Sequence, residues 1–337
     1  MAGTIDGTFT YRGGSVAPGE RADFRYTVSE TYLGDPVRLP VTIVNGDRPG
    51  PTVGLTAATH GDELNGIEVV RTVAQSWDLD ELAGTVVCLP VVNVPGFLAQ
   101  QRYLPILDRD LNRSFPGDTE GTSAKRIAAT VFDNFIQPLD VLLDFHTSTR
   151  DRNNMLHVRA NMDNESVSRL AQSFAAPVII AREGPEGSLR REATEAGVPA
   201  ITVELGEAHR FQRDLIDSAL DGVTSVFAEY DLFEREAVHW PGWRAIVDST
   251  NEKTWIRADA GGIVEMRYDR GSLVHEGDEI CQITNPFMGD PVSVEAPFTG
   301  VIVGVLENPV VYPGNPMVHF IELDERTTRV LEAMQSG

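Results

Sequence analysis

Two histidines and one glutamate in this chain have the types and spacing of a metal-ligand set. His60 and Glu63 lie three residues apart in the run Thr56-Ala-Ala-Thr-His-Gly-Asp-Glu-Leu-Asn-Gly66, which follows an apolar stretch. His146 ends a second apolar stretch, which begins at Asp140. Such a set leaves a fourth position for water, as catalytic zinc sites do. A helix-capping acid beside a chance histidine is the plainer interpretation of the first pair, but His146 argues against it.

A polar loop, Asp108-Arg-Asp-Leu-Asn-Arg-Ser-Phe-Pro-Gly117, has the composition of an anion-binding segment. The guanidinium of Arg113 can hold a carboxylate with two parallel hydrogen bonds, and Asn112 can add a donor. A surface salt-bridge cluster is the alternative. The apolar residues Leu111 and Phe115 within the motif favour a buried loop instead.

Glu204 is a charged residue inside the apolar run Ala200-Ile-Thr-Val-Glu-Leu-Gly206. A carboxylate there is costly unless it has a partner. Beside a metal it would serve as a general base that accepts a proton from water. A strand-end glutamate that points to solvent is the alternative interpretation.

Apolar patterns predict the elements that must position these residues. We expect strands at 37–44, 52–59, 85–92, 141–145, 155–158, 177–181 and 200–205, and helices at 64–77, 123–136, 165–175, 188–196 and 213–233. The residues before 37 are expected to form an irregular lead. The alternation predicts an α/β fold with a mostly parallel sheet and helices on both faces. Each motif lies where a strand ends, the edge at which such folds build their sites.

The pattern changes after the run His239-Trp-Pro-Gly-Trp243. Up to Leu323 the chain shows short strands, many glycines and no convincing helix. Gly262-Ile-Val is echoed by Gly300-Val-Ile, and this internal duplication predicts a small all-β barrel or sandwich. Its spacing resembles that of a biotinyl/lipoyl-like barrel.

A carrier domain of that kind needs a lysine at a hairpin tip. The sequence has no lysine between Asp259 and Glu322, which excludes covalent attachment in this segment. We therefore predict a catalytic domain over residues 1–240, a β-domain without a carrier lysine over 241–325, and a tail over 326–337.

Charge is the strongest compositional signal: the 337-residue chain has a formal net charge of −22. This charge argues against a nucleic-acid partner, which needs clustered basic residues. Lysine occurs only at positions 125 and 253, and acidic residues are spread along the chain. That pattern predicts a protein of a halophilic microbe, whose acidic surface stays soluble in salt.

Neither a membrane span nor a secretion signal is expected, because the chain has no long apolar run and no basic, apolar start. A cytoplasmic location follows as an expectation. Cys88 and Cys281 are the two cysteines, and they suggest no disulfide framework.

Four motifs occur in a familiar order: His60-Gly-Asp-Glu63, the run from Asp110 to Gly117, Asp144-Phe-His146 and Ile201-Thr-Val-Glu204. Together they resemble the succinylglutamate desuccinylase/aspartoacylase family, a branch of the zinc carboxypeptidase clan. The resemblance covers roughly residues 35–235, and a C-terminal β-domain is also usual in that family.

The resemblance implies one zinc ion held by His60, Glu63 and His146. Asp110 would orient His60 and raise its basicity. Glu204 would be the general base toward a water activated by the metal.

The resemblance also implies the substrate contacts. Asn112 and Arg113 would bind the carboxylate of an N-acyl amino acid. Arg102 would polarise the scissile carbonyl, with Arg109 as a competitor, because the spacing from Arg102 to Asn112 is about one residue longer than expected.

Some residues near the motifs are left without a firm role. Arg190 and His209 lie near the ends of the predicted strands, and neither is assigned. The remaining histidines have no motif around them and are interpreted as structural: His157, His239, His275 and His319.

The leading hypothesis is a zinc-dependent deacylase that hydrolyses the amide bond of an N-acyl amino acid, a small-molecule substrate. A zinc carboxypeptidase acting on peptide C-termini is the main alternative, and an esterase is a third. A carrier or binding module is a non-enzymatic alternative, disfavoured by the missing lysine. The acyl group, the amino acid and the oligomeric state stay open, and a homo-oligomer is compatible with the chain.

Overall fold

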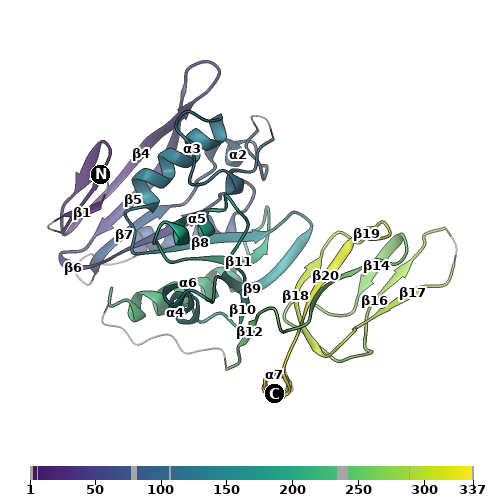
Figure 1. Cartoon of the computed structure of the whole chain (residues 1–337). Helices are drawn as coiled ribbons and strands as arrows, with labels where there is room; N and C mark the ends of the chain where they lie inside the picture. The colour runs from purple at the N-terminus through teal and green to yellow at the C-terminus, as the bar shows by residue number, and fades with distance from the viewer. Residues whose placement is uncertain are drawn as a thin grey trace.

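The computed structural model describes residues 3–5, 7–76, 82–105, 108–233, 242–287 and 289–335. A main body and a smaller β-rich part lie side by side (Figure 1). Strand β9 lies between them and pairs with β11 on one side and β18 on the other. The strands of the main body are β1 Gly3–Ile5, β2 Thr8–Tyr11, β3 Gly14–Val16, β4 Glu20–Glu30, β5 Pro36–Asn45, β6 Arg48–Ala57, β7 Ala83–Leu89, β8 Val141–Ser148, β9 Arg152–Ala160, β10 Val178–Ala181 and β11 Ala200–Glu207. Its helices are α1 Asn65–Ser76, α2 Val94–Leu98, η2 Leu111–Arg113, α3 Ser123–Val131, η3 Phe132–Ile136, α4 Glu165–Ser173, α5 Leu189–Glu195 and α6 Arg213–Glu229.

One large sheet positions the predicted site residues. Its order is β13-β20-β18-β9-β11-β8-β6-β7-β5-β4. The four central strands β11, β8, β6 and β7 are parallel, whereas β9 and β5 flank them in antiparallel pairing. The predicted α/β class is confirmed, and the sheet as a whole is mixed, with further parallel pairing of β10 with β9 and β12.

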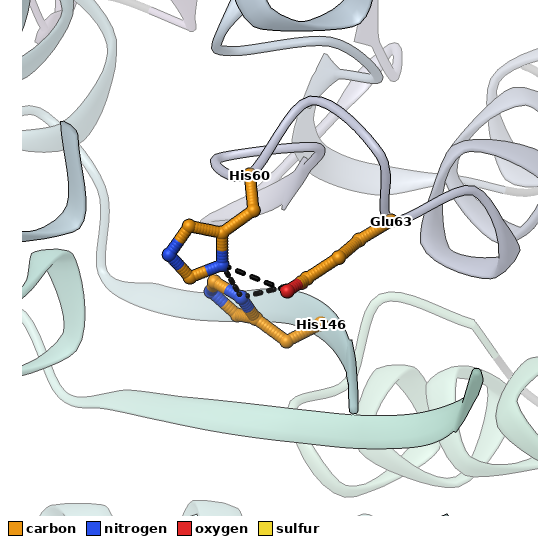
Figure 2. Close-up of side chains that lie close together, drawn as sticks. All are labelled: His60, Glu63 and His146. Carbon is orange, nitrogen blue, oxygen red and sulfur yellow. Dashed lines mark hydrogen bonds and ion pairs between the residues drawn. The ribbon is translucent and has the colours of Figure 1, made fainter. Parts of the chain in front are cut away.

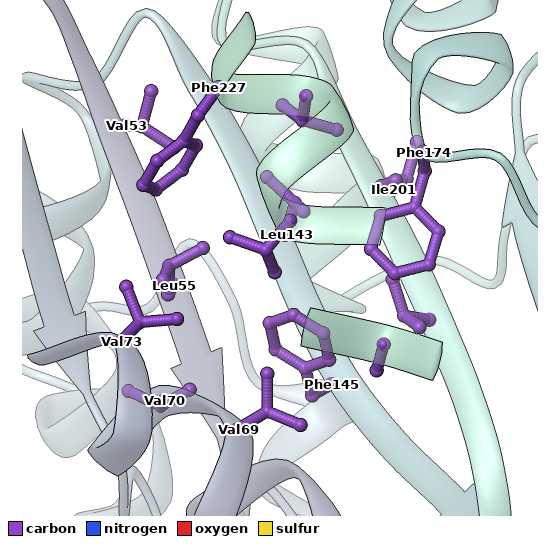
Figure 3. Close-up of a cluster of buried hydrophobic side chains, with 14 of the residues drawn as sticks. Val53, Leu55, Val69, Val70, Val73, Leu143, Phe145, Phe174, Ile201 and Phe227 are labelled. Atoms are coloured by element: carbon purple, nitrogen blue, oxygen red, sulfur yellow. The ribbon is translucent and has the colours of Figure 1, made fainter. Parts of the chain in front are cut away.

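Alternating side chains of the central strands fill two cores, one on each face of the sheet. Val141, Leu143 and Phe145 of β8 pack with α1, α4 and α6, while Leu142 faces the side of α3 and α5. Figure 3 shows the first core, in which Val53, Leu55 and Ile201 meet helix residues such as Val70. Burial of each such side chain contributes about 1.5–3 kcal/mol. These cores hold rigidly the strand ends from which the site is built.

The N-terminal lead is ordered in strands, so the prediction of an irregular segment before residue 37 is wrong. Strands β1, β2 and β3 form a small sheet, and β4 pairs antiparallel with β5 at the edge of the large sheet. The side chains of Ala22, Phe24 and Tyr26 lie against the second core. An edge strand buries one face only, so only every second residue is apolar. This alternation is a weaker signal in the sequence than the continuous apolar runs of the central strands.

The C-terminal part is all-β up to residue 322 and ends in a helix. Its elements are β12 Ala245–Val247, β13 Lys253–Arg257, β14 Gly262–Met266, β15 Leu273–Val274, β16 Glu279–Thr284, β17 Val292–Glu295, β18 Gly300–Leu306, β19 Val310–Val311, β20 Pro316–Glu322 and α7 Glu325–Gln335. A four-stranded sheet, β17-β16-β14-β19, packs over the strands that extend the large sheet. The segment predicted as a tail therefore carries helix α7.

The C-terminal part is joined to the main body by backbone pairing. Strand β12 runs parallel to β10, and β18 pairs antiparallel with β9, from Gly304 opposite Asn154 to Leu306 opposite Arg152. The predicted boundary at residue 240 lies in the stretch 234–241, outside the described residues. Among the helices of the described ranges, none is long and apolar enough to cross a membrane.

Candidate metal centre and active site

The three predicted metal ligands meet at the carboxyl ends of β6 and β8 (Figure 2). The Nδ1 atom of His60 lies 2.8 Å from Oε1 of Glu63, and Nδ1 of His146 lies 2.9 Å from Oε2 of the same carboxylate. The two Nδ1 atoms are 3.2 Å apart. His60, Glu63 and His146 are 3%, 1% and 4% exposed. Three ligand atoms thus converge on one small, buried volume.

Two aspartates fix the far side of both imidazole rings. Nε2 of His60 lies 3.2 Å from Oδ1 of Asp110, and Nε2 of His146 lies 2.7 Å from Oδ2 of Asp144. When each Nε2–H donates to its aspartate, both Nδ1 lone pairs face the Glu63 carboxylate. Electron pairs gathered in this way need a cation between them, so the donor set fits a metal ion.

Asp144 lies in the motif Asp144-Phe-His146, but the sequence alone did not assign it a role. Its side chain is fully buried on β8, and Thr56 Oγ1 donates to Asp144 Oδ1 at 2.6 Å. It lies two residues before His146 on the same strand, and residues with this spacing share one face. The two-residue spacing from His146 along a predicted strand was the signal in the sequence that could have identified Asp144 as a partner of this ligand.

The electrostatics of the ligands follow from their closeness. Burial alone raises the pKa of Glu63, but His60 and His146 outweigh it and hold that pKa well below its usual range. Burial alone lowers the pKa of His146, but Asp144 and Glu63 outweigh it and raise that pKa well above the usual value. For Asp110, the bond to His60 overcomes burial and lowers the pKa. The centre therefore favours positive charge between its carboxylates.

The turn that carries His60 and Glu63 is held close to helix α2. The Gly61 N–H donates to the Arg102 carbonyl oxygen at 3.2 Å. A Cβ atom on Gly61 would lie 2.1 Å from the carbonyl carbon of Gly96. Glycine at position 61 is thus required by close backbone packing.

Glu204 lies beside the ligands on the next strand. In the parallel pairing of β11 with β8, Glu204 is opposite His146, so both side chains lie on the same face of the sheet. Nε of Arg159 is 3.1 Å from Glu204 Oε1, and Nδ2 of Asn154 donates to Oε2 at 3.3 Å. Its side chain is 14% exposed, which disagrees with the alternative of a solvent-facing glutamate.

The predicted anion-binding loop is anchored by its two apolar residues. Leu111 and Phe115 are 0% and 4% exposed, whereas Asp108, Arg109, Arg113 and Pro116 are exposed, so the loop is buried only in part. The Asp110 side chain caps η2 by accepting from the Asn112 N–H at 2.9 Å. Oδ1 of Asn112 accepts from the Leu189 N–H at 2.8 Å, which leaves its amide N–H groups as the donors. Asn112 and Arg113 both line the cavity in front of the ligands.

Arg102 and Arg109 are separated by the fold. Arg102 lines the cavity, and its NH1 donates to Oε1 of Glu63 at 2.6 Å. Arg109 is exposed, and its carbonyl oxygen accepts from the Leu104 N–H. Of the two candidates, Arg102 is the one placed at the centre.

The cavity has a volume of about 680 Å³, a size that suits a small molecule. Six arginines line it: Arg102, Arg113, Arg152, Arg159, Arg182 and Arg190. Trp255 of β13 also lines it, so the C-terminal part contributes to the wall. Sequence reasoning did not identify Arg152, Arg159, Arg182 or Trp255, because no motif surrounds them.

The unassigned residues are now placed. Arg190 lines the cavity from α5, whereas His209 lies 3.8 Å from Asp62 and 2.7 Å from NH2 of Arg150. The histidines at positions 157, 275 and 319 were interpreted as structural. None of them is among the described residues that line the cavity. His239 lies outside the described residues.

Comparison with known proteins decides the family. Residues 49–230 match the model of the succinylglutamate desuccinylase/aspartoacylase catalytic domain. The chain belongs to this family. The resemblance found in the four motifs is thereby confirmed.

Individual relatives agree with this assignment. The chain is 26% identical over 255 residues to an N-alpha-acetyl-L-2,4-diaminobutyric acid deacetylase of Halomonas elongata, covering 73% of this chain and 74% of that one. A succinylglutamate desuccinylase from Silicibacter superposes with a TM-score of 0.79 at 23% identity, covering 90% and 95% of the two chains. The product-bound ectoine utilization protein EutE from Ruegeria pomeroyi gives 0.77 at 22%, with the same coverage. These two structures establish a shared fold.

Family and site together define the class of enzyme. The protein is an amide-bond hydrolase of the deacylase family, with a metal-binding site formed by His60, Glu63 and His146. The predicted enzyme class is confirmed at this level.

Proposed function

We propose that the protein hydrolyses the amide bond of an N-acyl amino acid with one zinc ion at His60, Glu63 and His146. The observation that carries this proposal is the register of β11 on β8, which places Glu204 opposite His146 at the wall of the cavity. Imidazole nitrogens and a carboxylate suit zinc. When bound, zinc supplies a Lewis acid that lowers the pKa of water towards about 7 and polarises the carbonyl.

The residues of the chain supply the other parts of the reaction. Asn112 and Arg113 bind the α-carboxylate and so fix the amide bond in the cavity. Glu204 accepts a proton from the attacking water at its carboxylate and returns it to the leaving nitrogen. Arg102 stabilises the negative charge that develops on the carbonyl oxygen.

A substrate panel tests the proposal. Release of free amine is measured, with zinc present, for N-acetyl and N-succinyl amino acids and for short peptides. We expect turnover of at least one acyl amino acid and of no unmodified peptide. Turnover of peptides alone would move the protein to a carboxypeptidase role, which Asn112 and Arg113 would serve equally well.

A further inference from the structure

The buried side chain of Asn65 joins the turn of the metal ligands to the strand of the proposed base. Asn65 begins α1 two residues after Glu63, and it is 0% exposed. Its Nδ2 donates to the carbonyl oxygen of Leu205 at 3.0 Å, and Leu205 directly follows Glu204 on β11. One side chain therefore links the backbone beside a metal ligand to the backbone beside the base.

Gln212 supplies the other contacts of the Asn65 amide. The Gln212 N–H donates to Oδ1 of Asn65 at 2.9 Å, and Oε1 of Gln212 accepts from Nδ2 of Asn65 at 3.0 Å. The same Oε1 accepts from the Glu207 N–H at 2.8 Å. Gln212 is the residue immediately before α6, so the start of this helix is tied both to α1 and to the end of β11.

Strand β11 is irregular directly after Glu204, where these contacts are made. Its pairing with β8 shifts register between Glu204 and Glu207. Gly206 lies within the irregularity with a φ of +76°, and a Cβ atom there would collide with Oε1 of Gln212. A bulge interrupts the hydrogen-bond ladder and redirects the side chains beside it. The direction of Glu204 therefore depends on what holds this part of the strand.

The C-terminal part holds Gln212 from the other side. Nε2 of Gln212 donates to Oδ1 of Asn153 at 3.1 Å, and Nε of Arg270 donates to the same oxygen at 3.1 Å. Arg270 lies between β14 and β15, and its NH2 also pairs with Oδ2 of Asp214 on α6 at 3.1 Å. Gln212 is thus fixed between a buried amide of the main body and an arginine of the C-terminal part.

We infer that Asn65 and Gln212 are positioning residues, which hold the carboxylate of Glu204 at a fixed place relative to the metal ligands. The inference rests on the proposed function, because that function makes Glu204 the base. Neither positioning residue lines the cavity. Proton transfer depends closely on the geometry of the base, whereas substrate binding depends on the cavity wall. Loss of these contacts is therefore expected to lower kcat, with little change in KM or in zinc content.

Variants of Gln212 with the same side-chain length test the inference on the zinc-loaded enzyme. Gln212→Met fills the space without polar atoms, and we expect it to lower kcat about tenfold, as loss of hydrogen bonds to the strand would do. Gln212→Glu keeps an oxygen that can accept from Glu207 and Asn65. It is therefore expected to recover most of the kcat that the methionine variant loses.

Asn164→Ala is the matched control. Asn164 is the half-buried residue before α4, and its side chain accepts from the Val167 N–H at 3.1 Å. This variant also weakens the start of a helix, but it removes no contact to β11. We expect its kcat to equal that of the wild type, so that a general loss of helix stability is separated from loss of positioning.

Hydrogen exchange gives a readout that does not depend on turnover. Exchange is followed by mass spectrometry in peptides that contain the Glu207 amide, on the zinc-loaded protein. We expect faster exchange in Gln212→Met, which lacks the acceptor, and unchanged exchange in Asn164→Ala. Gln212→Ala is measured in the same way, because it leaves room for water and keeps the test decisive if the methionine variant does not fold.

The outcomes separate the inference from the proposed function. Unchanged kcat in a folded Gln212→Met, or a change confined to KM, overturns the inference although the wild type is active. Equal losses of kcat in Gln212→Met and Gln212→Glu overturn it as well, because the acceptor oxygen would then have no effect. Unchanged exchange at Glu207 overturns it even where no amide is hydrolysed. Absence of turnover by the wild type counts against the proposed function instead.

Discussion

Glu204 is held by two residues that leave it usable as a base. Arg159 contacts one carboxylate oxygen and Asn154 the other, and each oxygen keeps a lone pair for a proton. The carboxylate is thus oriented towards the cavity before a substrate arrives. Such preorganisation is what a general base needs, because geometry precedes proton affinity in proton transfer.

His319 gives the fold a predicted sensitivity to acid. Burial, with smaller contributions from Arg159 and Arg182, lowers its pKa from 6.5 to about 3, and its ring stacks on Trp255 at 4.8 Å. The folded protein keeps this ring neutral, whereas the unfolded chain takes up a proton below about pH 6.5. The contribution of His319 to stability is therefore fully present above that pH and is lost progressively as the pH falls towards 3.

We expect His319→Phe to reduce this loss, because phenylalanine keeps the stacking and takes up no proton. The free energy of unfolding, measured with urea at pH 7 and pH 5 in the same salt, should fall by up to about 2 kcal/mol less in the variant than in the wild type. Equal losses in the two proteins would show that His319 does not stay neutral in the fold.

At this scale the sequence predicted the residues that lie within motifs. His60, Glu63 and His146 could be placed because each follows an apolar strand, and parallel strands bring their carboxyl ends to one edge. Arg152 and Arg182 could not be placed. Both line the cavity only because β9 and β10 lie side by side in the sheet, which is a matter of topology that no local pattern contains.

Among the elements, β18 links the C-terminal part to the active site. It pairs with β9 so that Gly304 lies opposite Asn154, the residue that donates to Glu204. A Cβ atom on Gly304 would lie 2.4 Å from Oδ1 of Asn154. A residue of the C-terminal part thus makes room for a side chain that positions the proposed base.

Gly304→Ala is therefore expected to lower kcat about tenfold, the cost of losing one hydrogen bond to a charged group, without loss of bound metal. Asn154→Ala should have a similar effect. The double variant should lose no more than either single one, because both act on one contact. Additive losses in the double variant, or loss of the metal, would mean that Gly304 and Asn154 do not act through one shared contact.

The elements of the main body were predictable to the extent that they are buried. Central strands and amphipathic helices have strong apolar patterns, so the predicted elements between β5 and α6 lie close to their predicted ranges, whereas the short helices α2 and η2 were not predicted. In strand β4, Ala22, Phe24, Tyr26 and Val28 alternate with polar residues such as Arg21, Asp23 and Arg25, which is the pattern of a half-buried strand. The prediction relied on continuous apolar runs, which mark the central strands, and therefore missed it.

Across the whole molecule, charge is divided between surface and cavity. Acidic residues exceed basic ones by 22 in the chain, whereas arginines predominate around the substrate site. We propose that the acidic surface is adapted to high salt, because screening reduces the repulsion among its carboxylates.

This division predicts that the folded state needs salt. The midpoint of thermal unfolding should rise with KCl up to molar concentrations, and structure measured by circular dichroism should be lost at low salt. Matched sucrose solutions control for general effects of exclusion from the protein surface. Full retention of structure without added salt would contradict the proposal.

The most direct test of the central claim combines metal content with turnover. The protein is stripped with a chelator, reloaded with zinc and assayed on an N-acyl amino acid, for the wild type and for Glu204→Gln. We predict that the stripped wild type is inactive, that one zinc per chain restores it, and that Glu204→Gln binds the same zinc but turns over about 100- to 10,000-fold more slowly. Full activity of the stripped wild type, or of zinc-loaded Glu204→Gln, would contradict the account.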